Sequence, residues 1–330
     1  MTPTLLGPAP APPAGPGRRS RARTVLRALA IASCSPYLGL KTAWIAGSTV
    51  GIPAHSTLLD HRGAMIAGNS ASVLLDACVI VLALLLTQGW GRRVPAWLPA
   101  FPMWVATGLL APVMAGFPLQ LLVRGLGGST TPAAPRAPFL DGWVFGAVYC
   151  GFIVQGLTLG TLFVLYARDR WGHLWRGRAG ELPTRTATAP VQRATAVAAA
   201  LLALLPALMH TLWACGVEAG LSPARITDRT SDFYALEAVY AAFALVSAAG
   251  ALLLAFRRSG RLPAWVPLSL SWTGSGALAC WGAWLLISSL ASSGPDAAQT
   301  QLMTLTYAVQ MTVGLLVLSA GASFLAERDR

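Results

Sequence analysis

Eight stretches of this chain are apolar over a length that can cross a lipid bilayer, which takes about 20 helical residues. They run from Val25 to Gly47, Ala64 to Thr87, Ala96 to Val123, Trp143 to Ala167, Val191 to Cys215, Phe233 to Phe256, Ala264 to Leu290 and Gln299 to Ala326. A backbone within hydrocarbon must satisfy its own hydrogen bonds, so each stretch is expected to be a helix. Only 11% of the residues are charged, against roughly 25% in soluble proteins. We therefore predict an all-α integral membrane protein with eight transmembrane helices.

The arginines are distributed unevenly between the two sides of these segments. Eighteen lie on the side of the N-terminus, and five lie on the opposite side, namely Arg62, Arg124, Arg136, Arg225 and Arg229. Basic residues concentrate in cytoplasmic loops, so we expect a multi-pass protein of the cell membrane with both termini in the cytoplasm. The net charge of +12 is then a topology signal. The expected partner is the lipid bilayer and not nucleic acid, because no basic stretch resembles a nucleic-acid-binding domain.

Changes in composition suggest the organisation of the chain. Residues 1–24 are rich in Pro, Ala and Arg and cannot bury a core, so we expect a disordered cytoplasmic tail. Residues 25–167 contain the first four apolar segments, and residues 194–330 contain the last four. Residues 168–193 are expected to form an Arg-rich cytoplasmic linker between them.

The two groups of four segments resemble each other. A shift of 168 places the sequence RVPAW of residues 93–97 on RLPAW of residues 261–265, and a shift of 169 places Trp44 and Gly47 on Trp213 and Gly216. Shared apolar composition does not place Trp, Pro and Gly in register, so we interpret the chain as two four-helix repeats. An even number of spans gives both repeats the same orientation. We therefore expect them to be parallel and related by a pseudo-twofold axis along the membrane normal.

Seven polar residues inside the segments are candidates for binding a substrate or an ion, namely Lys41, Asn69, Asp76, Gln155, His210, Glu237 and Gln310. By the repeat, His210 corresponds to Lys41, the only lysine of the chain, and Glu237 corresponds to Asn69. Each unit thus places a basic residue and a second polar residue near the outer boundary. An ionisable group in a bilayer is costly unless it is paired or hydrated, which makes it a functional-site hypothesis. The alternatives are a structural pair or, for Lys41, an ammonium that snorkels to the surface.

Proline is frequent in the third segment, where Pro99, Pro102, Pro112 and Pro118 occur. Proline removes a backbone donor and kinks a helix. Kinked helices line the substrate sites of many transporters, but kinks also arise from packing alone.

Other site signatures are absent from the sequence. The five cysteines show no redox or zinc spacing and are typical of small packing residues. We predict no catalytic residue, no metal and no cofactor.

The stretch from Gly39 to Gly47, the Ala/Gly/Arg-rich composition and the single lysine resemble uncharacterised polytopic membrane proteins of high-GC actinobacteria. The resemblance implies a membrane protein and no particular activity. Three functions remain open. They are a small-molecule transporter or permease with a polar site between the two repeats, a non-catalytic membrane component such as a sensor, partner subunit or assembly factor, and a membrane-embedded enzyme. Neither the substrate nor the oligomeric state follows from the sequence.

Overall fold

The computed structural model describes residues 18–56, 58–60, 62–129, 140–179, 188–257, 261–291 and 299–328. Within these ranges the chain is helical, and the only β-type pairing there is an isolated bridge between Arg178 and Pro263. The helices are α1 (Arg18–Ile45), α2 (Arg62–Thr87), η1 (Gly89–Arg92), α3 (Trp97–Gly125), α4 (Gly142–Trp171), η2 (Gly172–Trp175), α5 (Ala189–Ala214), α6 (Pro223–Thr227), α7 (Ser231–Phe256), α8 (Trp265–Ala291) and α9 (Gln301–Arg328).

Each of the eight apolar segments coincides with one long helix, so the predicted all-helical class is confirmed. Six of the described helices, α2, α3, α4, α5, α7 and α9, are long and apolar enough to cross a membrane. The helices α1 and α8 have the length of a membrane span but are not among these six. A helix of 26 residues such as α2 measures about 39 Å at 1.5 Å per residue, which exceeds a hydrocarbon core of about 30 Å.

Two of the predicted boundaries differ from the structure. The helix α1 begins at Arg18, so residues 18–24 are helical where we expected a disordered tail, and residues 1–17 lie outside the described residues. The linker is also shorter than expected, since α4 continues to Trp171 and α5 begins at Ala189. Arginine is a good helix former, and a basic composition therefore does not mark the end of a helix.

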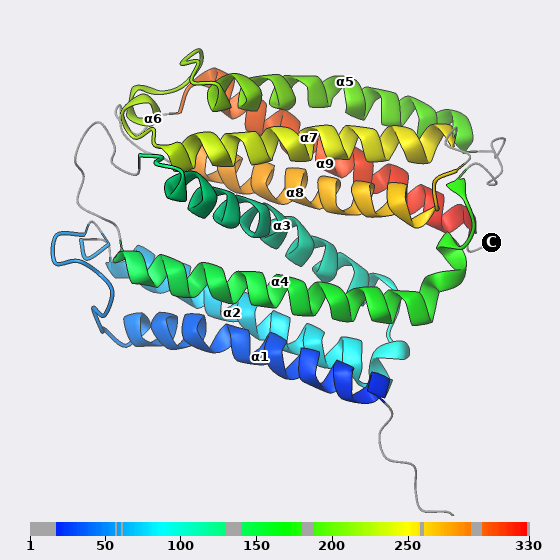
Figure 1. Cartoon of the computed structure of the whole chain (residues 1–330), viewed down its shortest axis with the longest axis horizontal. Helices are drawn as coiled ribbons and strands as arrows, with labels where there is room; N and C mark the ends of the chain where they lie inside the picture. The colour runs from blue at the N-terminus through cyan, green and yellow to red at the C-terminus, as the bar shows by residue number, and fades with distance from the viewer. Residues whose placement is uncertain are drawn as a thin grey trace, which may run out of the picture.

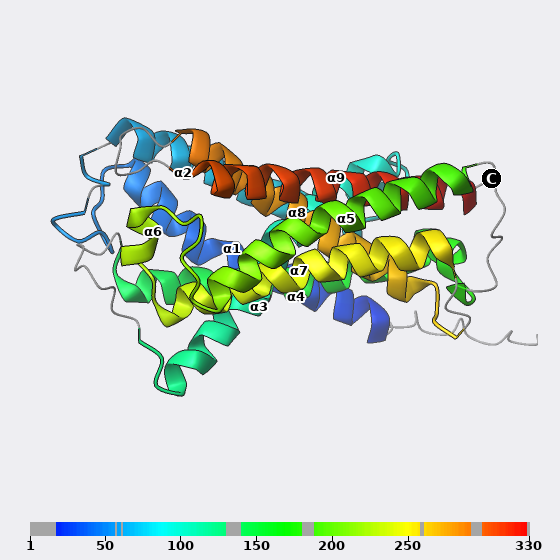
Figure 2. The ribbon, with the colours of Figure 1, turned by 90° about the horizontal axis from the view of Figure 1, so that it is seen from above.

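The long helices run between the same two ends of the molecule and form two groups (Figures 1 and 2). In Figure 1, α1, α2 and α4 lie together in the lower part, and α5, α7, α8 and α9 lie together in the upper part. The helix α3 runs obliquely between them and packs against α4 on one side and against α7 and α8 on the other. The same pairings occur in both groups, because α1 packs against α2 and α4 as α5 packs against α7 and α9.

The contact between α3 and α8 is close because glycines face each other. A Cβ atom added to Gly108 would lie 2.3 Å from the carbonyl oxygen of Gly276, a distance that real Cβ atoms do not reach. Indole groups reinforce this contact, since Trp104 donates a hydrogen bond of 2.9 Å to Ser275 and Trp281 donates one of 3.2 Å to the carbonyl of Leu109. The boundary between the two halves is therefore filled by packed helices where α3 meets α8.

The two repeated RxPAW loops are both held by the segment from Arg170, in the last turn of α4, to Ala179. The Arg170 guanidinium donates a 2.6 Å hydrogen bond to the carbonyl of Val94. At the other end of this segment, the backbone N–H of Ala179 donates a 2.8 Å bond to the carbonyl of Leu262. Val94 and Leu262 are equivalent at the shift of 168, so one short segment fastens the same position of both halves.

At the opposite end of the molecule, α3 is fastened to α7. The Arg124 guanidinium forms a bidentate ion pair with Asp232, and the side-chain amide of Gln120 donates a 3.2 Å bond to the Asp232 carbonyl. The backbone N–H of Ser231 also donates a 2.9 Å bond to Ser129. The end of α3 is thus tied to the second group of helices.

Candidate functional site

The first part of the site is built around the C-terminal end of α5. Pro206 lies one turn before His210 inside this helix, and proline cannot donate the backbone hydrogen bond of its position. The helix ends four residues after His210, where Gly216 takes a positive φ of 86° that favours glycine. His210 is consequently held near one end of the bundle, on the face of α5 that packs against α7 and α9.

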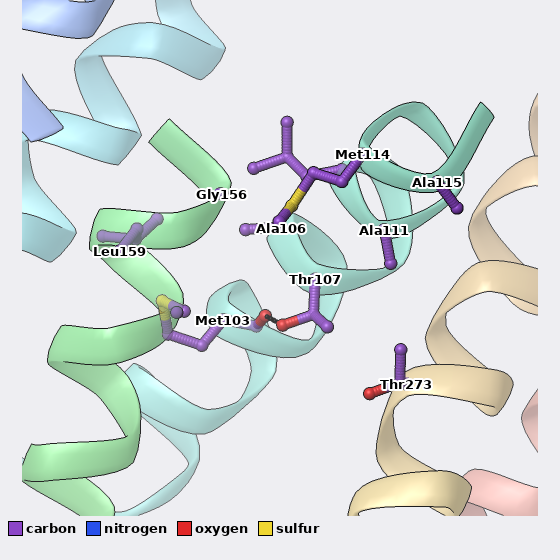
Figure 3. Close-up of a pocket in the computed structure, with 11 residues that line it drawn as sticks. Met103, Ala106, Thr107, Ala111, Met114, Ala115, Gly156, Leu159 and Thr273 are labelled. Atoms are coloured by element: carbon purple, nitrogen blue, oxygen red, sulfur yellow. Dashed lines mark hydrogen bonds between the residues drawn. The ribbon is translucent and has the colours of Figure 1, made fainter. Parts of the chain in front are cut away.

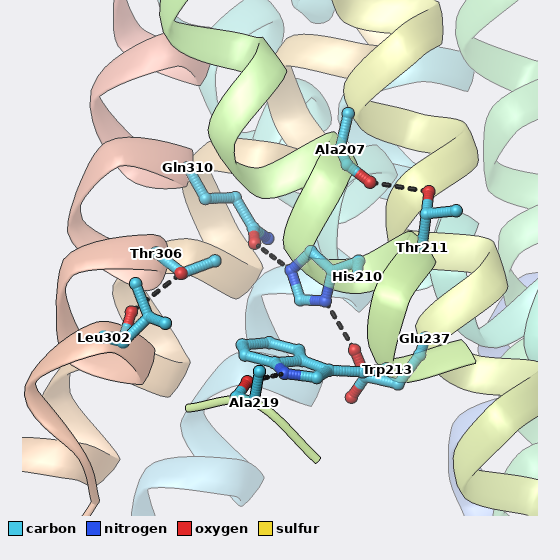
Figure 4. Close-up of polar contacts among 9 residues, drawn as sticks. All are labelled: Ala207, His210, Thr211, Trp213, Ala219, Glu237, Leu302, Thr306 and Gln310. Carbon is cyan, nitrogen blue, oxygen red and sulfur yellow. Dashed lines mark hydrogen bonds and ion pairs between the residues drawn. The ribbon is translucent and has the colours of Figure 1, made fainter. Parts of the chain in front are cut away.

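The His210 imidazole joins three helices through hydrogen bonds at both ring nitrogens. Its Nδ1 lies 2.5 Å from Oε2 of Glu237 on α7, and its Nε2 lies 2.9 Å from Oε1 of Gln310 on α9. Figure 4 shows the imidazole between these two side chains. His210 is 1% exposed and Glu237 is 6% exposed, so the network is closed to solvent.

The hydrogen-bond pattern determines where protons lie in this network. Gln310 presents its amide oxygen to Nε2 of His210, and this arrangement fits a proton on Nε2 because an amide oxygen can only accept. A second proton lies between Nδ1 and Glu237, because two acceptors cannot share a hydrogen bond. With a proton at each of these two places, His210 and Glu237 together carry no net charge, whether the second proton resides on the ring or on the carboxyl group. Such a pair can hold a proton without placing an unbalanced charge in an apolar environment.

Aromatic rings surround the imidazole and were not identified from the sequence as part of the site. The ring centres of Trp213 and Tyr240 lie 5.3 and 5.2 Å from that of His210. The Tyr240 ring lies 5.8 Å from that of Trp281 on α8. Trp213 lies three residues after His210 on α5. Side chains three apart on a helix are neighbours, so this spacing could have indicated the contact. Tyr240 has the same spacing from Glu237 on α7.

The second part of the site lies in the other group of helices. Asp76, Gln155 and Asn69 are each at most 5% exposed. The Asp76 carboxyl interacts electrostatically with Gln155 and Lys41, and its Oδ2 is buried without a hydrogen-bond partner among the described residues. The amide of Gln155 lies 3.8 Å from Sγ of Cys34. The side chains of Asp76 and Gln155 therefore interact within this group of helices, whereas Gln310, expected at the same depth, lies in the other group.

Lys41 occupies the place that corresponds to His210, but its ammonium has different neighbours. Its Nζ lies 4.9 Å from the ring centre of Tyr37 and 5.2 Å from that of Trp44, both on the same helix. Lys41 is half-buried and forms no hydrogen bond with Asn69 or Asp76 among the described residues. The basic residue and the following Trp are therefore arranged alike in both units, whereas the contact between Lys41 and Asn69 that the repeat suggested is not formed.

The turns that follow these two residues are alike in detail. The Trp44 indole donates to the carbonyl of Val50 at 2.7 Å, and the Trp213 indole donates to that of Ala219 at 3.0 Å. Both bonds join positions six apart, at the shift of 169. Gly47 and Gly216, at the same shift, have φ values of 99° and 86°. The Trp and Gly residues that revealed the repeat in the sequence are those that form the turn.

A cavity of about 420 Å³ lies between α3, α4 and α8 (Figure 3). Its lining is apolar apart from the hydroxyl groups of Thr107 and Thr273. We expected a polar site between the two repeats, but none of the seven predicted polar residues lines this cavity. His210, Glu237 and Gln310 lie within the α5, α7 and α9 group, and Asp76 and Gln155 lie within the α1, α2 and α4 group. The two sets of polar residues are separate because each is enclosed by helices of its own group. Neither set lies between the two repeats.

The side chains at these sites can form hydrogen bonds, and His210, Glu237 and Asp76 can bind or release protons. Within the described ranges, no group of three or more His, Cys, Asp and Glu side chains could hold a metal ion. Comparisons with protein-family models, with curated proteins and with solved structures found no match for this chain.

Proposed function

We propose that this protein is a transporter of the cell membrane that couples the movement of a small molecule or ion to a proton held by His210 and Glu237. It has eight transmembrane helices and both termini in the cytoplasm. The observation that carries the proposal is the buried network of His210, Glu237 and Gln310, in which a carboxyl oxygen lies 2.5 Å from an imidazole nitrogen.

The cost of such a pair supports a functional role. Apolar residues of similar size in place of a buried ion pair are often neutral or stabilising, so packing alone gives little reason to keep one. Ionisable residues inside membrane segments commonly form proton relays and ion pathways. The fully buried imidazole fits this pattern.

The apolar cavity is a suitable place for the substrate, and a chain of contacts connects it to the proton pair. His210 contacts Tyr240, Tyr240 contacts Trp281, and the Trp281 indole donates a hydrogen bond to the Leu109 carbonyl of α3. The next two residues of α3 line the cavity. A change in the proton pair can therefore act on α3 through packed side chains.

We also propose that the two groups of four helices arose by duplication and are arranged as parallel repeats. The matching turns after Trp44 and Trp213 support this, as do the matching helix pairings. The position of α3 departs from the repeat, because α3 packs against α7 whereas its counterpart α8 makes no comparable contact with α2. A pseudo-twofold axis would then relate the remaining helices better than it relates α3 and α8.

Proton movement in liposomes tests the transporter proposal. Purified protein would be reconstituted with a trapped pH-sensitive dye and exposed in turn to amino acids, sugars, organic cations and carboxylates. We expect one class to drive acidification of the lumen, and we expect Glu237→Gln to abolish it because the amide cannot exchange the proton. Glu218→Gln is the control, since Glu218 is exposed in an adjacent loop. Solute-driven acidification that persists unchanged in Glu237→Gln would reject the coupling role.

Reporter fusions test the topology. Fusions after Arg93 and Arg261 should give cytoplasmic signals, and fusions after Gly128 and Ala224 should give external signals, because the arginines concentrate on one side. Signals of one kind at both Arg93 and Gly128 would mean that α3 does not cross the membrane.

A second candidate is a non-catalytic membrane component. The close packing of Gly108 against Gly276 favours it, because a rigid boundary between the halves does not need to move. In this case no solute in the liposome assay would move protons, although the protein would be folded.

A further inference from the structure

A basic pocket of about 330 Å³ lies at the end of the bundle that carries the start of α1. It is lined by Arg23 and Arg27 of α1, Thr87 at the end of α2, and Arg168 and Asp169 near the end of α4. Neither His210, Glu237 nor the apolar cavity belongs to it. The pocket is therefore a separate feature from the transport site proposed above.

The charges of the pocket are unbalanced. Asp169 accepts from the Arg23 guanidinium at 2.5 Å, and the guanidinium groups of Arg92 and Arg168 lie 3.7 and 3.9 Å from its carboxylate. Arg27 has no ion-pair partner among the described residues. Three guanidinium groups, those of Arg23, Arg92 and Arg168, thus share one carboxylate, which positions them. The three arginines and one aspartate that line the pocket leave two positive charges in excess. Guanidinium groups bind phosphate oxygens through paired hydrogen bonds.

The pocket lies where a phospholipid headgroup would be found. Thr87 is the last residue of α2, one of the helices that are long and apolar enough to span a membrane. On α4, Val164 lies one turn before Arg168 on the same face and is 63% exposed, and Leu157, further along that face, is 56% exposed. An exposed apolar strip of α4 therefore leads from the hydrocarbon region to the arginines.

We propose that this pocket binds the phosphate group of an anionic phospholipid, with the acyl chains lying along the exposed face of α4. Free inorganic phosphate offers the same oxygens to the guanidinium groups. The apolar strip favours the lipid, because it adds a contact that free phosphate cannot make.

Native mass spectrometry of the full chain in detergent can measure the affinity for phosphatidylglycerol and for phosphatidylcholine. We expect phosphatidylglycerol to bind more tightly. Each arginine near a membrane surface contributes about 1 kcal/mol toward anionic lipid, so Arg27→Gln with Arg168→Gln should weaken phosphatidylglycerol binding about 30-fold. The control is Arg93→Gln with Arg261→Gln, which removes the same charge from two exposed positions outside the pocket and should change the affinity much less.

Asp169→Asn gives a change of opposite sign and does not depend on whether the double variant folds. Removing this carboxylate adds one net positive charge to the pocket, so phosphatidylglycerol should bind about 5-fold more tightly. Equal affinity for the two lipids, equal losses in both double variants, or unchanged or weaker binding in Asp169→Asn would each overturn the proposal. Competition of millimolar inorganic phosphate with phosphatidylglycerol, with equal affinity for both, would assign the pocket to free phosphate and overturn the lipid assignment. None of these readouts depends on transport.

Discussion

A double-mutant cycle at His210 and Glu237 measures how strongly the buried network depends on its shared proton. In His210→Leu, Glu237 keeps its 6% exposure but loses the nitrogen 2.5 Å away. Breaking a buried pair in this way costs about 3 to 5 kcal/mol when the remaining group stays charged. In Glu237→Leu, the neutral imidazole keeps its bond to Gln310 and loses one hydrogen bond, so the expected cost is about 1 to 3 kcal/mol.

The double variant should be less damaged than the two single variants suggest. With both side chains replaced by Leu, no buried charge remains, and only the Gln310 oxygen loses its partner, at a cost of about 1 to 3 kcal/mol. We therefore expect a coupling free energy of roughly 3 kcal/mol. Reversible unfolding in mixed detergent micelles, followed by Trp fluorescence, gives the free energy of unfolding for each variant.

The corresponding residues of the first unit provide the control. Lys41 and Asn69 occupy the matching positions but form no hydrogen bond with each other in the described structure, so Lys41→Leu and Asn69→Leu should be additive within about 0.5 kcal/mol. Additive costs at His210 and Glu237 as well would refute the shared proton as the source of the interaction.

Three other variants test the packing and the second polar group. Gly108→Ala should destabilise the protein by about 1 to 3 kcal/mol, because its Cβ would lie 2.3 Å from a carbonyl oxygen of α8. The control Gly160→Ala, with no atom within 4 Å of its Cβ, should be neutral or stabilising. Equal shifts of the melting temperature in the two variants would contradict this. Asp76→Asn should raise the free energy of unfolding by about 1 kcal/mol or more, because it removes a charge from a carboxyl group with one oxygen buried without a partner. The gain should be larger when Lys41 is changed to Met, since the ammonium of Lys41 interacts with the Asp76 carboxylate; equal gains with and without Lys41 would show that the two residues are not coupled. Trp213→Phe should cost about 1 kcal/mol by removing one indole hydrogen bond, and a change below 0.3 kcal/mol, on the order of measurement error, would argue against a stabilising role of that turn.

The helices could be predicted from the sequence because hydrocarbon leaves a backbone few alternatives. Length and hydropathy alone located all eight long helices, and the repeated Trp and Gly residues located the two turns that they form. The start of α1 could not be predicted in the same way, since a run of arginines has the same composition in a helix and in a disordered tail.

The candidate site could be predicted only in part. The correspondence between Lys41 and His210 indicated equivalent positions, and each of the two residues lies one turn before the Trp of a matching turn. The sequence did not indicate that Asp76 and Gln155 would lie in one group of helices and Gln310 in the other. The rotation of each helix about its axis could not be predicted from the sequence. This rotation places His210 against Glu237 of another helix, whereas Lys41 lies against Tyr37 and Trp44 of its own helix. The tilt of α3, which determines where the cavity forms, could not be predicted either.

The position of α3 has a mechanical consequence. Although the sequence matches divide the chain four and four, α3 is bound to α7 by Arg124 and to α8 through Gly108. It should therefore travel with the second group as a rigid body of five long helices, while α1, α2 and α4 form a body of three. The segment from Arg170 to Ala179 fastens the Val94 and Leu262 loops at one end and would act as the hinge. The sliding surface would then run between α3 and α4, so a rocking motion would change the volume of the cavity directly.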